Sequence, residues 1–331
     1  MKDENFLVTG GAGFIGSHLV DRLIREKPRN LVVVDNFFLG KTANLKEAKK
    51  AFPELKVYNQ DVCNQKEMKK IIEDNRIRVI FDLAVLPLPM SLVQPRLTFE
   101  KNVEMTLSMC ELLREDAYEK LIHFSSSEVY GSALYDPMDE KHHLGSTTPY
   151  AASKAASDLL VQSYGSTYGT YATIVRPFNN YGPRQNDESY AGIIPITIKR
   201  IAAGENPIIF GTGEQTRDYT YVTDTAEVTV NIYKNPKTRG KILNVGSGKE
   251  TSILELVKLI VKHTDCKKPI RFENKRPGDV MRHVADISEL KKYCDYSPKV
   301  ELNEGVKRTV EWYLKKLKTN GGGVTDHEES K

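Results

Sequence analysis

The stretch Gly10-Gly-Ala-Gly-Phe-Ile-Gly16 follows a short apolar run at residues 6–9, and Leu19 and Leu23 continue beyond it at helical spacing. It satisfies the pattern G-x-G-x-x-G from Gly11 onward. A glycine-rich turn between a strand and a helix lets the backbone approach a pyrophosphate, and the positive end of the helix then faces its charge. The stretch therefore predicts a dinucleotide-binding strand–turn–helix unit.

Short apolar runs and amphipathic stretches alternate from this turn up to residue 178. The predicted strands are 31–34, 56–58, 78–84, 121–125 and 172–176, and the predicted helices are 66–73, 98–113 and 150–168. Strand–helix repetition favours right-handed crossovers and an open parallel sheet covered on both faces. We therefore predict an α/β fold, a Rossmann-like doubly wound parallel sheet with a smaller α/β substrate-binding lobe.

The rhythm of the sequence changes after residue 178, where Pro and Gly become frequent and the elements shorten. We predict a dinucleotide-binding domain at 1–178, to which some later segments return, and a second lobe at 179–318. This lobe is expected to cover the carboxyl ends of the strands, where open α/β sheets bind ligands. Residues 319–331 are Gly-rich and then polar, which predicts a disordered tail.

Composition excludes several classes of protein. The 331 residues include 48 Lys and Arg against 44 Asp and Glu, a net charge of +4 without a polybasic run, so neither nucleic acid nor membrane is an expected partner. The apolar stretch at 79–93 is interrupted by Asp82, Pro87 and Pro89 and cannot span a bilayer. Four widely separated cysteines predict reduced thiols in a cytoplasmic protein, and no residue group has the spacing of a metal site.

A carboxylate ends the second predicted strand. Asp35 stands 25 residues after Gly10, near the offset of the acid that binds the adenosine ribose. Such a carboxylate accepts hydrogen bonds from the 2′-hydroxyl and repels a 2′-phosphate, so we predict NAD rather than NADP. Asp61 and Val62 follow the third strand and are expected to contact the adenine.

Two further motifs indicate catalysis. Tyr150-Ala-Ala-Ser-Lys154 begins a predicted helix, and residues four apart lie on one helix face. A free phenol, with a pKa near ~10, is a poor base. The Lys154 ammonium and the positive nicotinamide of NAD are expected to lower that pKa. The spacing alone equally fits a surface Tyr–Lys pair, but beside the glycine turn it predicts a catalytic pair. Upstream, Ser125-Ser-Ser-Glu-Val-Tyr-Gly131 leaves the fifth strand at the same sheet edge.

Together these motifs resemble the extended short-chain dehydrogenase/reductase family, specifically its NAD-dependent nucleotide-sugar epimerases and dehydratases. The resemblance extends to Arg176-Pro-Phe-Asn-Asn-Tyr-Gly-Pro-Arg184, to 216–224, to Asn244-Val-Gly246 and to Arg276-Pro-Gly-Asp279, and covers residues 5–315. It implies a nucleotide-sugar substrate linked to UDP, dTDP or GDP. It also implies a homodimer formed through a four-helix bundle.

The resemblance also implies roles for single residues. Ser126 would hydrogen-bond the sugar 4-hydroxyl, Tyr150 would be the base, and Lys154 would hold the nicotinamide ribose. The expected catalytic residues are Ser126, Ser127, Glu128, Tyr150 and Lys154. The expected cofactor contacts are Gly10, Gly13, Phe14, Ile15, Gly16, Asp35, Asn36, Asp61, Val62, Leu83, Ala84, Asn102, Tyr150 and Lys154. The expected substrate contacts are Pro87, Arg184, Phe210 as a stacking platform for the base, and Asn179, Arg217 and Arg276 on the pyrophosphate.

One segment departs from the family pattern. The fourth strand ends Phe81-Asp-Leu-Ala-Val85, where the family usually has His-Leu-Ala-Ala, and an apolar loop rich in proline follows at 86–91. The loop lies beside the expected sugar site, so the departure concerns the identity of the sugar and leaves the cofactor unaffected.

Glu128 discriminates between the possible reactions. A 4,6-dehydratase needs a base for the C5 proton, whereas the equivalent position of a 4-epimerase is usually not acidic. Glucose dehydratases usually carry Asp-Glu here, and this chain has Ser127-Glu128, as in uronic acid decarboxylases and some dehydratases of 2-acetamido sugars. We expect a 4,6-dehydratase, with a 4-epimerase as the first alternative and a UDP-glucuronate decarboxylase as the second. An NAD(P)-binding sensor without turnover is a remote alternative, because the catalytic motif is intact.

Overall fold

The first strand, β1 (Asn5–Thr9), is buried along its whole length and lies inside a seven-stranded parallel sheet. The computed structural model describes residues 4–188, 191–274 and 280–321. The strand order of the sheet is β11-β6-β5-β4-β1-β2-β3. Its other members are β2 (Asn30–Asp35), β3 (Lys56–Asn59), β4 (Val79–Asp82), β5 (Lys120–Phe124), β6 (Thr173–Pro177) and β11 (Ile242–Val245). The order reverses at β1, which pairs with β2 on one side and β4 on the other, and the predicted crevice is expected at this switch point.

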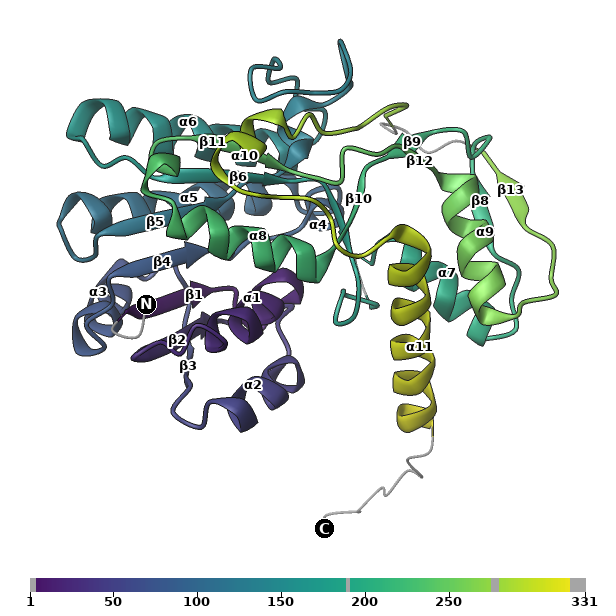
Figure 1. Cartoon of the computed structure of the whole chain (residues 1–331), viewed down its shortest axis with the longest axis horizontal. Helices are drawn as coiled ribbons and strands as arrows, with labels where there is room; N and C mark the ends of the chain where they lie inside the picture. Colours follow the sequence, from purple (N-terminus) through teal and green to yellow (C-terminus); the bar gives the residue numbers. More distant parts are fainter. Residues whose placement is uncertain (1–3, 189–190, 275–279, 322–331) are drawn as a thin grey trace.

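Helices cover both faces of the sheet, because alternate strand residues are apolar on both sides (Figure 1). One core joins Phe6, Val8 and Val33 to the helices α1, α8 and α10, and the other joins Leu7, Val32 and Ile80 to α3, α5 and α6. These helices are α1 (Phe14–Ile24), α3 (Gln65–Asp74), α5 (Pro95–Arg114), α6 (Pro149–Tyr168), α8 (Val222–Lys234) and α10 (Ser288–Tyr293). The predicted doubly wound sheet is confirmed.

A smaller lobe lies beside the sheet, at the right of Figure 1. Its core packs Ile198, Leu256 and Val310 from three helices against Tyr181. The helices are α7 (Ile193–Ala202), α9 (Ile253–Thr264) and α11 (Leu302–Gly321). Short strand pairs surround them: β7 (Asn179–Tyr181) with β10 (Tyr219–Tyr221), β8 (Ile208–Phe210) with β13 (Arg271–Glu273), and β9 (Thr216–Arg217) with β12 (Thr251–Ser252). The remaining elements are α2 (Lys46–Ala51), α4 (Leu88–Ser91) and the 3-10 turns η1 (Thr42–Leu45), η2 (Ser127–Tyr130) and η3 (Pro236–Thr238).

Several boundaries differ from the sequence-based expectation. The fourth strand ends at Asp82 rather than residue 84, because the backbone amides of Leu83 and Ala84 donate to Thr9 Oγ1 (3.0 and 3.1 Å) instead of continuing the ladder. The last helix, α11, runs to Gly321, so residues 319–321 of the expected tail are helical. The rest of that tail lies outside the described residues. Among the helices that the structure describes, none is both long and apolar enough to cross a membrane.

Candidate active site

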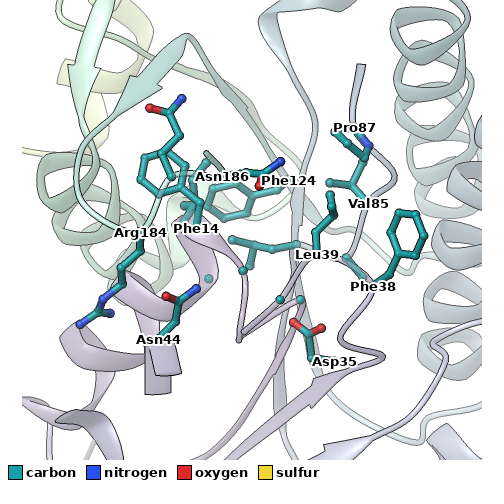
Figure 2. A pocket seen from close by; sticks show the side chains of 18 of the residues that line it. Phe14, Asp35, Phe38, Leu39, Asn44, Val85, Pro87, Phe124, Arg184 and Asn186 are labelled. Atoms are coloured by element: carbon teal, nitrogen blue, oxygen red, sulfur yellow. The ribbon is translucent and has the colours of Figure 1, made fainter. Parts of the chain in front are cut away.

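A cavity of about 830 Å³ opens at the carboxyl edge of the sheet, at the switch point (Figure 2). The ends of β1, β2, β3, β4 and β5 all reach its wall, and residues of α1, α6 and α11 line it as well. Figure 2 shows Phe38, Val85 and Pro87 gathered on one side of the cavity, with Asn44 and Arg184 on the other. A volume of this size is large enough for a dinucleotide with part of a second ligand.

The glycine turn forms one wall of this cavity. Gly10 has a positive φ of 62°, and its amide donates to Val34 O (2.8 Å), which ties the turn to β2. A Cβ added to Gly16 would lie 2.3 Å from Gly10 O, so no other residue fits there without a shift of the backbone. Helix α1 begins at Phe14 without a side-chain cap at Gly13, which leaves its first N–H groups for an anion. These features fit a pyrophosphate.

Asp35 lies at the floor of the cavity and is only 5% exposed. Its carboxylate oxygens accept hydrogen bonds from the backbone amides of Ala12 (2.9 Å) and Phe37 (2.8 Å). Burial raises the pKa of this carboxyl group, while the two amide bonds oppose the shift. Each carboxylate oxygen can accept a second bond, so Asp35 can fix the glycine turn and still bind a ribose hydroxyl.

Most of the expected cofactor contacts share this one cavity. The wall includes Gly10, Gly13, Phe14, Ile15, Gly16, Asp35, Asn36, Asp61, Val62, Leu83, Ala84, Tyr150 and Lys154. Asn102 is buried behind it, where its Oδ1 accepts from Leu86 N (2.8 Å) and its Nδ2 donates to Ser153 Oγ (2.9 Å). Asn102 therefore supports the loop after β4, whose residues do reach the cavity.

The local sequence explains where the catalytic helix begins. Thr148 Oγ1 accepts from Ala151 N (3.1 Å), and Pro149 occupies the first turn of α6, where its missing N–H costs nothing. Tyr150 and Lys154 follow one turn apart, and both line the cavity. The Ser126 hydroxyl is hydrogen-bonded to the Tyr150 phenol and accepts from Glu128 N (3.2 Å).

Burial dominates the electrostatics of this pair. It raises the pKa of Tyr150 to about 12, against the hydrogen bond from Ser126, which lowers it. Burial lowers the pKa of Lys154, while the carboxylates of Asp82 and Asp158 raise it. The group that opposes burial at Tyr150 is thus Ser126.

Ser127 and Glu128 lie just beyond the cavity wall, in η2. Ser127 is buried, and its carbonyl oxygen is 3.2 Å from His283 Nε2. Glu128 is half-buried, and its charge acts to raise the pKa of Tyr150. The carboxylate is therefore within electrostatic reach of the phenol.

The expected substrate contacts separate into two groups. Pro87 and Arg184 line the cavity; Arg184 has a positive φ of 66° and pairs with Asp21 of α1 (2.7 Å), which places it beside the glycine turn. Asn179 is not on the wall, although its neighbour Asn180 is. Phe210 and Arg217 belong to β8 and β9 of the second lobe and do not line this cavity. Arg276 lies outside the described residues.

Some residues of the cavity wall are not among those that the sequence predicts. Trp312 and Lys316 of α11 line the cavity, and Lys316 pairs with Asp187 (2.7 Å), which holds the loop after β7 against the helix. Lys41 is a further wall residue and also approaches Asp187 (3.9 Å). An amphipathic helix so late in the chain carries no sequence signal that connects it to the first glycine turn.

The fold and the site together define a Rossmann-type dinucleotide-binding protein with a Ser, Tyr and Lys group at the carboxyl edge of its sheet. Comparison with known proteins narrows this class. The profile of the GDP-mannose 4,6-dehydratase family matches residues 7–309. The chain therefore belongs to this family of NAD-dependent extended short-chain dehydrogenases/reductases, the nucleotide-sugar epimerases and dehydratases, as the sequence motifs predict.

Individual relatives are named for different activities. A putative UDP-glucose 4-epimerase of Methanocaldococcus jannaschii is 35% identical, over 92% of this chain and 97% of the relative. A dTDP-D-glucose 4,6-dehydratase of Bos taurus is 34% identical, over 94% and 88%. The structure of a Bacillus anthracis dTDP-glucose 4,6-dehydratase in complex with NAD superimposes with a TM-score of 0.85 at 28% identity, over 95% of this chain and 98% of that one.

Proposed function

We propose that this protein is an NAD-dependent nucleotide-sugar 4,6-dehydratase. The observation that carries the proposal is the position of Glu128, two residues beyond Ser126 and within electrostatic reach of the Tyr150 phenol. The substrate is an NDP-hexose, with an NDP-N-acetylhexosamine included in the class. Water leaves across C5 and C6 of a sugar that has been oxidised at C4.

The cofactor is NAD, held by the glycine turn at its pyrophosphate and by Asp35 at its adenosine ribose. Two features of the structure support this assignment. Neither Gly10 nor Gly16 has room for a Cβ atom, and helix α1 begins without a side-chain cap. When bound, NAD supplies the acceptor for the C4 hydride and the donor that returns it to C6. Asp35 would repel a 2′-phosphate, which favours NAD over NADP.

Tyr150 accepts the proton of the sugar 4-hydroxyl. Ser126 already bonds the phenol, so one hydroxyl can orient both the base and the sugar oxygen. Lys154 extends from the same helix face and holds the nicotinamide ribose with its ammonium. Each of the three side chains lines the cavity.

Glu128 takes the C5 proton. A ketone at C4 makes this C–H group acidic, so a carboxylate can remove the proton as the C6 hydroxyl departs. Ser127 stands where many glucose dehydratases have an aspartic acid. The departing C6 hydroxyl can instead take the proton that Glu128 has removed from C5, so that water leaves and Glu128 returns to its carboxylate form.

A 4-epimerase is the second candidate. Glu128 is not on the cavity wall, and the putative 4-epimerase relative is as similar as the dehydratase relatives. In that reaction the 4-keto sugar rotates in the site and receives the hydride on its other face, so no C5 proton moves. A decarboxylase would instead release carbon dioxide from a hexuronic acid.

The substitution Glu128→Gln separates these reactions, because it keeps the shape and removes the base. A dehydratase variant should form the 4-keto sugar and retain reduced cofactor, visible by near-ultraviolet absorbance, with no dehydrated product. Glu104→Gln, which changes an exposed carboxylate of α5, is the matched control and should behave as the unaltered protein. Dehydration at an unchanged rate in Glu128→Gln would reject Glu128 as the base.

The protein also forms a homodimer in this proposal, through α5 and α6. These helices pack against each other and carry exposed apolar side chains on their outer faces, namely Leu97, Phe99, Leu107, Leu159 and Tyr168. Light scattering should give twice the mass of the chain, and Leu159→Glu should halve it. Leu134→Glu, in a loop away from both helices, should leave the mass unchanged.

A further inference from the structure

Three polar residues stand side by side across the centre of the sheet. Thr9 ends β1, Asp82 ends β4 and His123 belongs to β5; Thr9 is the register partner of Asp82, and Asp82 is the register partner of His123. Thr9 Oγ1 donates to Asp82 Oδ1 (2.8 Å), and His123 Nδ1 lies 2.9 Å from Asp82 Oδ2. Both carboxylate oxygens are therefore fixed by neighbouring strands.

This row faces the helix layer that carries Lys154. Side chains two residues apart share a face of a strand, and Leu7, Ile80 and Leu121 pack in the core beneath α5 and α6. Thr9, Asp82 and His123 each follow one of them by two residues, so they extend the same face toward the cavity. The polar row thus lies where the apolar core ends, under the catalytic helix.

The hydrogen-bond partners of Asp82 are a hydroxyl and an imidazole ring. Asp82 is 2% exposed and His123 is 1% exposed, and His123 Nε2 is buried without a partner. The geometry is that of an imidazole ring that donates to Asp82 Oδ2 through Nδ1, while Thr9 Oγ1 donates to Asp82 Oδ1. Neither of these two partners of Asp82 is a lysine or arginine side chain.

A negative charge near Lys154 stabilises its buried ammonium group. Its side chain is 4% exposed, and the two carboxylates that act on it are Asp82 and Asp158. Asp158 is already paired with the Arg176 guanidinium (2.8 Å), itself bonded to Tyr130. Among the described residues, Asp82 forms no ion pair with a lysine or arginine, and its charge acts on Lys154 from the sheet beneath α6.

We propose that Asp82 is a positioning residue of the active site: its carboxylate, fixed by Thr9 and His123, is the counter-charge that keeps the ammonium of Lys154 in place on α6. The histidine that the family pattern has at this position could not supply a negative charge. The inference rests on the proposed function for the role of Lys154 toward the nicotinamide ribose. Asp82 itself touches neither the cofactor nor the sugar in this account.

The test follows NAD affinity, with kcat as a second readout, from pH 7 to pH 11. Removing the Asp82 charge destabilises the ammonium, so in Asp82→Asn the fall of NAD affinity at alkaline pH should begin about one pH unit lower. Asp82→His, which restores the usual residue of the family, should shift it in the same direction. The other ionisable groups near Lys154 and Asp82 all remain in both variants; they are His123, Tyr150, Glu128, Asp158, Arg176, Cys110 and Tyr118.

Two controls separate a charge effect from a structural one. Thr9→Val removes the hydroxyl that donates to Asp82 and accepts from Leu83 N and Ala84 N, and it keeps the carboxylate of Asp82. It should therefore lower stability and weaken NAD binding at every pH, and leave the pH of the alkaline fall where it is. In a Lys154→Arg background the cation does not titrate in this range, so Asp82→Asn should no longer move the fall.

An alkaline fall at the same pH in both Asp82 variants, or an equal shift in Thr9→Val, would overturn the proposal. Loss of folding in both Asp82 variants would do so too, because it would make Asp82 a core residue. NAD binding requires no sugar, so a shifted fall in a protein that turns over no nucleotide sugar would reject the proposed function and leave the role of Asp82 intact.

Discussion

Tyr150 shows how much a catalytic side chain depends on its surroundings. A phenol whose pKa is raised to about 12 is protonated at neutral pH, so the protein on its own does not contain a ready base. The bond from Ser126 opposes this effect, and a positive charge brought near the ring would oppose it further. The active base therefore belongs to the complex with the cofactor.

The substitution Tyr150→Phe removes the acceptor of the 4-hydroxyl proton and little else. We expect kcat to fall by about a hundredfold or more, since general base catalysis contributes on this scale. NAD affinity should change by no more than a few fold, because Asp35 and the glycine turn remain. Steady-state kinetics and calorimetric NAD titration measure the two effects, and near-normal turnover would place the base elsewhere.

At the residue scale, the sequence predicted which residues line the cavity better than it predicted which side chains contact one another. The spacing of Tyr150 and Lys154 on one helix face was sufficient to bring both into the cavity. The sequence could not show that Asp82 and His123, 41 residues apart, meet at 2.9 Å, because that contact depends on the register of β4 and β5. For the same reason the sequence could not show that Asn102 bonds Leu86 N and supports the loop after β4 from behind.

At the scale of elements, local patterns located most helices and strands of the first half. The strand β11 was missed because it has only four residues and pairs with β6, nearly seventy positions earlier in the chain. Helix α8 was missed because its start, Val222-Thr-Asp224, directly follows β10 without an intervening loop. Only the parallel pairing and the packing of α8 on α1 assign these segments to the large domain.

The glycine turn between β1 and α1 gives a prediction at this scale. In Gly16→Ala the new Cβ would lie 2.3 Å from Gly10 O, so the turn must move. Backbone strain of this kind costs on the order of 1–3 kcal/mol, which corresponds to about a fivefold to hundredfold loss of NAD affinity. Fluorescence titration with NAD measures it.

Ser17→Ala is the matched control for this prediction. It changes the next residue of the same helix turn and removes only the bond from Ser17 Oγ to Phe14 O (3.1 Å). NAD affinity should stay nearly unchanged in this variant. Equal affinity in Gly16→Ala and the unaltered protein would contradict a close approach of backbone and pyrophosphate at this turn.

At the scale of the whole molecule, two buried histidines make stability depend on pH. Burial lowers the pKa of His18 and of His283 to about 4, from an ordinary value of 6.5. As the pH falls from 6.5 to 4, the unfolded chain takes up protons that the folded protein does not. The free energy of unfolding should therefore decrease in this window, by up to about 3 kcal/mol for each histidine.

His18→Gln tests this dependence, because the amide can still donate to Pro183 O, which His18 Nε2 contacts at 3.0 Å. Urea unfolding at pH 7 and pH 5 should show a smaller loss of stability in the variant than in the unaltered protein. His263→Gln, which changes a histidine at an exposed bond to Asn303, should keep the full loss. An identical loss in His18→Gln would show that His18 is protonated in the folded state.

The most direct measurement for the account as a whole is the fate of nucleotide sugars in heavy water. The unaltered protein is incubated with NAD and with UDP-, dTDP- and GDP-linked hexoses and their N-acetyl derivatives, and products are followed by mass and by NMR. A 4,6-dehydratase gives one product that has lost water, with solvent deuterium at C5 and the original C4 hydrogen at C6. An isomer of unchanged mass, with C5 free of deuterium, would contradict the dehydratase and establish a 4-epimerase.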